Sequence, residues 1–196
     1  MKKIIFIFAI AATTLAACNS TGNKSTGNQK ANNGTQASSQ TDNAKTSSGV
    51  NNTAATKEMV IQYLHIKDGL AKDNGNDAAT AAKAFVETTA KVDIASFNAD
   101  KKKTWEDISA DAKEMAEHIG ANPDKLEHQR EHFEMLSKDM YDLVKAFGGG
   151  QILYKVFDTM YNNGKGAFWL SETKEIKNPY MGKAMLNSGA IQEEIK

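Results

Sequence analysis

Two histidines, His128 and His132, have the spacing of paired metal ligands on a helix. Residues four apart lie on adjacent turns of one helix face, so both imidazoles can point the same way. Such a pair binds Zn, Cu or Ni when a third ligand completes the set. His118 and His65 belong to other predicted segments, and the sequence does not place them near the pair. The alternative interpretation is two solvated histidines on the polar face of an amphipathic helix.

Three methionines, Met160, Met181 and Met185, lie close together in the C-terminal stretch, where Asp158 accompanies them. Thioethers are suitable ligands for Cu(I), whereas the carboxylate of Asp158 would shift the preference towards harder ions. Methionines also fill irregular gaps in protein cores, which is the alternative interpretation. Copper and zinc are therefore the ions that the sequence suggests, at either the histidine pair or the methionine cluster.

Motifs of known enzyme sites are missing from the sequence. It contains no nucleophile elbow, no His-Glu-x-x-His and no phosphate-binding glycine loop after a strand. The run of glycines at 148–150 follows a predicted helix, which is the wrong context for phosphate binding. The basic side chains form no stripe interleaved with aromatic residues, so nucleic acid is not an expected partner. The sequence predicts a protein that is not an enzyme.

The N-terminus has the features of a bacterial lipoprotein signal peptide over residues 1–17. Two lysines precede a short apolar run, and Leu-Ala-Ala leads to Cys18, the one cysteine of the chain. The apolar run is well short of the roughly 20 residues that cross a bilayer. We expect lipidation of Cys18, because several acyl chains anchor a protein stably in a membrane. The predicted location is an exported, lipid-anchored form at the outer membrane, facing the periplasm.

Residues 18–56 form a predicted tether behind the lipidated cysteine. They are almost entirely Asn, Ser, Thr, Gly, Gln, Ala and Lys, and such a composition buries too little apolar area to fold. The tether would hold residues 57–196 clear of the lipid. Those 140 residues are long enough for one domain with its own core, and they carry a net charge of −4.

Four amphipathic helices are predicted in the first two thirds of that domain. Apolar residues recur every three or four positions over about 57–72, 77–95, 100–120 and 123–147. Asn122-Pro123 has the pattern of a helix start, and glycines follow two of the predicted helix ends. Short connections between such helices predict an antiparallel four-helix bundle in an all-α fold.

The remaining residues, 151–196, are predicted to be irregular but packed on the bundle. Residues 151–157 are compatible with a short strand or a fifth helix. The predicted structural anchors of this segment are Trp169, Pro179 and Tyr180. Arg130 is the sole arginine of the chain, and we expect it to form a buried ion pair with a carboxylate such as Glu172 or Glu175.

Several strings of the chain resemble one family closely. They are Gly-Ala-Phe-Trp-Leu-Ser at 166–171, Glu-Ile-Lys-Asn-Pro-Tyr-Met-Gly at 175–182 and Met-Leu at 185–186, with weaker matches in the helices. The family is the domain of unknown function DUF3347, found in bacterial periplasmic lipoproteins and appended to adaptor subunits of heavy-metal efflux pumps. The resemblance covers roughly residues 57–192.

The resemblance implies a helical domain associated with copper and related soft metals. The family pattern has cysteines at two positions that are Asp158 and Ser188 here. Two hypotheses follow. The first is a non-enzymatic lipoprotein that binds metal or assists heavy-metal efflux components, with Met160, Met181, Met185 and the histidine pair as ligands. The second is a structural or protein-interaction module that kept the fold after losing its metal ligands.

Overall fold

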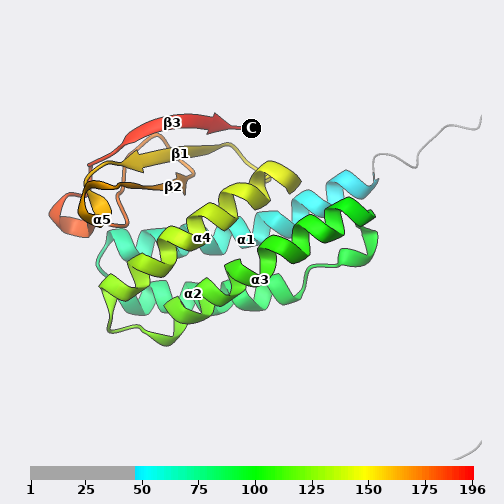
Figure 1. The fold of residues 1–196 in the computed structure, drawn as a ribbon, viewed down its shortest axis with the longest axis horizontal. Helices are drawn as coiled ribbons and strands as arrows, with labels where there is room; N and C mark the ends of the chain where they lie inside the picture. Colours follow the sequence, from blue (N-terminus) through cyan, green and yellow to red (C-terminus); the bar gives the residue numbers. More distant parts are fainter. Residues whose placement is uncertain (1–46) are drawn as a thin grey trace, which may run out of the picture. The chain divides into compact units, whose positions relative to one another are not determined.

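The computed structural model of the chain describes residues 47–196, with side chains from Thr56 onward (Figure 1). The predicted signal peptide, the lipidation of Cys18 and residues 19–46 of the predicted tether lie outside this range. Within 47–196, no helix combines the length and the apolar character that crossing a membrane requires.

Four long helices make up most of the described structure. They are α1 (Ser47–Ala71), α2 (Gly75–Ala90), α3 (Ala99–Ala121) and α4 (Leu126–Phe147), with a short 3-10 turn, η1 (Ile94–Ser96), before α3. Asn74 and Asn98 cap α2 and α3, because each side chain accepts a hydrogen bond from a backbone N–H of the first turn. The prediction of long helices is thus confirmed, with differences at their ends.

Three helix ends differ from the prediction, and one of them is the end of α2, which lies at Ala90 instead of near residue 95. Helix α1 begins ten residues before Lys57, and Thr56 fastens its first part by donating a hydrogen bond to the carbonyl of Gly148 at 2.6 Å. A helix that is already formed extends at little cost through such residues. Helix α4 begins at Leu126 because Asn122 ends α3 instead, its side-chain amide donating to the carbonyl of His118 at 2.8 Å.

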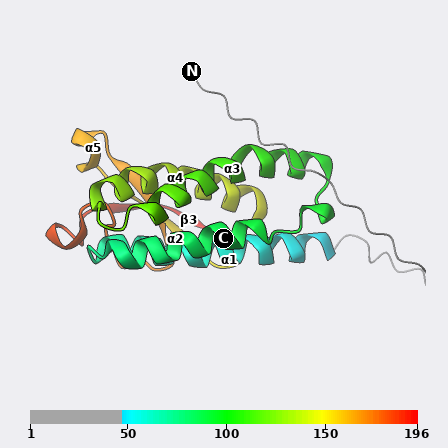
Figure 2. The same ribbon diagram turned by 90° about the horizontal axis from the view of Figure 1, so that it is seen from below.

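The helices pack as two helical hairpins lying side by side (Figures 1 and 2). Helix α1 contacts α2 and α4, and α3 likewise contacts both, so the four enclose one core. Tyr63 and Phe133 stack in it with ring centroids 5.0 Å apart. Phe97, Trp105 and Phe147 form an aromatic cluster with centroids 5.2–5.9 Å apart. A helical bundle therefore forms most of the fold.

The all-α prediction is wrong for the C-terminal segment, which forms a small antiparallel sheet. Its strands are β1 (Leu153–Asp158), β2 (Ala167–Ser171) and β3 (Ala190–Ile195), in the order β2-β1-β3. The connection between β1 and β2 contains one short helical turn, α5 (Tyr161–Gly164). Aromatic and β-branched residues favour strands, and Asn162 and Asn163 accept the positive φ that this tight connection needs.

The sheet is held on the bundle by a buried hydroxyl network. Strand β2 packs against α4 and α1. The hydroxyl of Tyr63 accepts the backbone N–H of Leu170 at 3.0 Å and shares a hydrogen bond with Ser137 at 2.8 Å. Tyr180 donates its hydroxyl proton to the carbonyl of Phe168 at 2.7 Å. These contacts join α1, α4 and the sheet in one domain.

The segment between β2 and β3 includes the 3-10 turn η2 (Gly182–Ala184), and its Tyr180 packs edge-on against Trp169 of β2 with ring centroids 5.9 Å apart. Trp169 is fully buried and Tyr180 nearly so. The expected partner of Arg130 was wrong: its guanidinium bonds Asp73 at 2.5 Å and the carbonyl of Pro179 at 2.8 Å. Glu172 instead pairs with the buried ammonium of Lys67 at 2.6 Å, because it follows β2 on the α1 side.

Candidate metal centre

Three imidazoles converge on the outer seam between α3 and α4. One ring nitrogen each of His118, His128 and His132 lies within 4.8 Å of the other two. The rings of His118 and His132 are stacked with centroids 4.3 Å apart, and that of His128 stands edge-on to His132 at 4.4 Å. The predicted pair is thus on one face of α4, and a third imidazole comes from α3.

The helical hairpin explains why His118 is there. In two antiparallel helices, residues equally distant from the connecting loop face each other. His118 and His128 flank the loop at Pro123 in this way, and Met115 and His132 flank it one turn further out. The spacings within each helix, three residues on α3 and four on α4, keep each pair on one face. Sequence reasoning missed His118, although this symmetry about Pro123 could have found it.

The centre lies at the protein surface. His118 is exposed, whereas His128 and His132 are half-buried. Burial lowers the pKa of His132 below its ordinary value, and the neighbouring imidazoles of His118 and His128 lower it further. The carboxylates of Glu131 and Glu114 act in the opposite direction on this pKa. A lowered pKa keeps the imidazole neutral near pH 7, which is the form that binds metal.

Two carboxylates stand beside the imidazoles. Glu131 lies 3.6 Å from Nδ1 of His128, and Glu114 lies 3.9 Å from Nε2 of His118. Carboxylates in such positions orient ligating histidines and raise their basicity. Nitrogens bound to one tetrahedral ion are about 3.4 Å apart, given bonds of roughly 2.0–2.1 Å. Small rotations of the partly exposed rings would bring the three nitrogens to that spacing.

The other predicted ligands occupy a different part of the fold. Met160 and Met185 are exposed, at 53% and 38%, and Met181 is half-buried. Asp158 is buried and its carboxylate is already used: one oxygen accepts the backbone N–H groups of Met160 and Tyr161. Capping of the chain turn that follows β1, not metal ligation, accounts for these contacts.

The second oxygen of Asp158 binds the side chains of Asn178 and Ser188, both at 2.6 Å. Burial alone would raise the pKa of Asp158, but the hydrogen bonds, led by that of Ser188, outweigh it and lower the pKa. Asp158 and Ser188 occupy the two positions where the resemblance implies cysteines. In this chain they form a hydrogen-bonded junction between β1 and the segment before β3.

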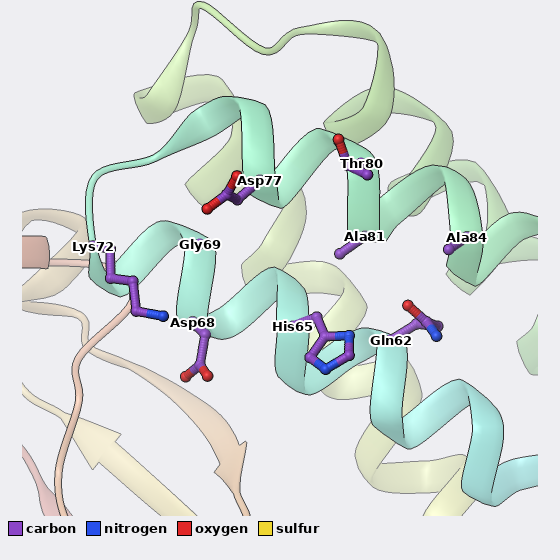
Figure 3. Close-up of a pocket in the computed structure, with 9 residues that line it drawn as sticks. All are labelled: Gln62, His65, Asp68, Gly69, Lys72, Asp77, Thr80, Ala81 and Ala84. Carbon is purple, nitrogen blue, oxygen red and sulfur yellow. The ribbon is translucent and has the colours of Figure 1, made fainter.

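A pocket lies between α1 and α2 (Figure 3). Gly69 allows the two helices to approach closely, because a Cβ there would lie 2.6 Å from the backbone nitrogen of Ala78. The lining includes Gln62, Asp68, Lys72 and a single imidazole, His65. His65 has no second histidine beside it in this pocket, so it serves as a reference for the clustered histidines.

Comparison with known proteins identifies the helical part of the chain. A family model described as "Protein of unknown function (DUF3347)" matches residues 59–151, from the packed part of α1 to just beyond α4. The strings at 166–186, which suggested the same family, lie beyond this match. None of the curated proteins or solved structures compared matches the chain. The four-helix part of the chain, which carries the three histidines, thus matches the DUF3347 family over residues 59–151.

Proposed function

We propose that the protein is a non-enzymatic metal-binding protein whose centre consists of His118, His128 and His132. The observation that carries the proposal is the convergence of three imidazole nitrogens, from two helices, to within 4.8 Å of one another. Imidazole is a ligand for zinc, copper, nickel and iron, and three imidazoles with an open fourth position are an established zinc arrangement. The ion would join α3 to α4 across the loop at 122–125.

The cellular role that we propose follows from the sequence. A lipidated Cys18 would anchor the protein to a membrane, and the tether would hold the domain in the periplasm. There the domain would bind heavy-metal ions of the copper type and assist efflux components. The exposed carboxylates near the site, Glu114 and Glu131, support this role, since negative charge raises the local concentration of cations.

The test is a titration of the purified full chain with Zn(II) and, without oxygen, with Cu(I). We expect binding tighter than about 1 μM, which corresponds to about −8 kcal/mol. His118→Ala, His128→Ala and His132→Ala should each weaken it at least about tenfold, or 1.4 kcal/mol. The matched control is His65→Ala, an exposed helical histidine outside the cluster.

Two results would count against the proposal. One is wild-type binding weaker than micromolar for both ions, which would favour the alternative of a structural or interaction module. The other is an equal effect of His65→Ala and His118→Ala. Replacing Met160 and Met185 together separates the two predicted ligand sets: we expect this double variant to bind like the wild type.

A further inference from the structure

A sulfur atom lies next to the three imidazoles. Sδ of Met115 is 3.4 Å from Nδ1 of His132. Met115 precedes His118 by three residues on α3, so both side chains project from the same helix face towards α4. The residue is half-buried and packs against the hydrophobic core, whereas His118 is exposed. The Met115 side chain is therefore fixed by its contacts with the core, whereas the imidazoles are accessible to solvent.

The distance suits two ligands of one ion. A sulfur at about 2.3 Å and a nitrogen at about 2.0–2.1 Å from a tetrahedral centre are about 3.5 Å apart. The observed separation of 3.4 Å is close to that value. Met115 and His132 could thus bind one ion without a movement of α3 relative to α4.

We propose that Met115 is the fourth ligand of the centre, and that its thioether makes the site prefer a soft monovalent cation, Cu(I), to Zn(II). This inference rests on the proposed metal binding by the three histidines. Thioethers are soft ligands that select Cu(I), whereas zinc is bound through imidazole, thiolate or carboxylate. Zn(II) would use the three imidazoles with water or with a nearby carboxylate such as that of Glu131.

The experiment compares the affinities of Met115→Leu and the wild type for Cu(I) and Zn(II) on the full chain. Leucine is close to methionine in volume, so the packing against the core is retained. We expect Cu(I) affinity to fall at least about tenfold and Zn(II) affinity to change less than about threefold. X-ray absorption of the Cu(I) form should show a copper–sulfur shell near 2.3 Å, which Met115→Leu removes. The matched control is Met135→Leu, an exposed methionine on α4 that should leave both affinities and the sulfur shell unchanged.

Three outcomes would overturn the assignment of Met115. They are a sulfur shell that persists in Met115→Leu, its loss in Met135→Leu instead, and an equal fall in Cu(I) and Zn(II) affinity. A failure of the three-histidine centre itself can be distinguished from a failure of the Met115 assignment. In the first case His118→Ala would leave the binding of both ions unchanged. If His118→Ala weakens both ions while Met115→Leu affects neither, the histidine centre stands and only the thioether ligand is refuted.

Discussion

The hydroxyl of Tyr63 links the bundle to the sheet, and its removal has a calculable cost. In Tyr63→Phe, the buried N–H of Leu170 loses its acceptor and Ser137 loses a partner. The ring itself stays stacked on Phe133, so packing changes little. An unsatisfied buried donor costs about 1–3 kcal/mol and a lost hydrogen bond about 1 kcal/mol. We expect the free energy of unfolding to fall by about 2–3 kcal/mol.

The assay is urea unfolding of the full chain at pH 7, followed by circular dichroism and by tryptophan fluorescence. Trp169 lies in β2 and Trp105 in α3, so fluorescence reports on the sheet as well as on the bundle. The matched control is Tyr154→Phe in β1, whose hydroxyl forms no hydrogen bond with the described residues. A loss below about 0.5 kcal/mol, or one equal to that of Tyr154→Phe, would refute the role of the network.

Two further predictions concern carboxylates whose pKa values are shifted, the buried Asp158 and the half-buried Asp139. The pKa of Asp158 is lowered, so its carboxylate stabilises the fold above the ordinary aspartate pKa, and this stabilisation is lost as pH falls through the folded value. Asp158→Asn should lower the free energy of unfolding by about 2 kcal/mol at pH 7. It should also make this free energy less dependent on pH in the acid range, and a pH dependence parallel to that of the wild type would contradict the prediction. Burial, then Asp111 and Asp142, raise the pKa of Asp139 to about 6, so its contribution to stability is present below about pH 4 and lost as pH rises through 6. Asp139→Asn should therefore raise the free energy of unfolding at pH 7 by about 1 kcal/mol, measured by thermal unfolding, and should no longer do so at pH 4; an equal gain at both pH values would contradict the assignment.

The helices could be predicted from sequence because their apolar residues recur at the helical period. The strands were harder to predict. Residues 151–157 have an apolar run that is too short to distinguish a strand from a helix, and β3 is largely exposed and lacks a buried alternating face. Its pairing with β1 depends on a partner more than 30 residues away, which local patterns do not reveal.

The side chains that hold the C-terminal segment on the bundle also include some features that the sequence predicts and some that it does not. Burial of Trp169 and Tyr180 could be expected from their size and apolar surface. The partner of Arg130 could not, because Asp73 lies in the loop between α1 and α2, 57 residues away. Several carboxylates in the sequence could have formed the ion pair with Arg130. The packing of the C-terminal segment at the end of the bundle that carries the α1–α2 loop selects Asp73.

The sequence by itself determined the candidate pair His128 and His132, since four-residue spacing on a helix depends on helical geometry alone. It also determined that residues 57–196 contain no thiol, which leaves imidazole, thioether and carboxylate as the available ligands. The tertiary structure decided that His118 and Met115 lie beside the pair, because side chains from different helices meet only when the α3–α4 hairpin sets their register. It also committed Asp158 to hydrogen bonds with Asn178 and Ser188, since those partners lie 20 and 30 residues away and reach it only in the folded sheet.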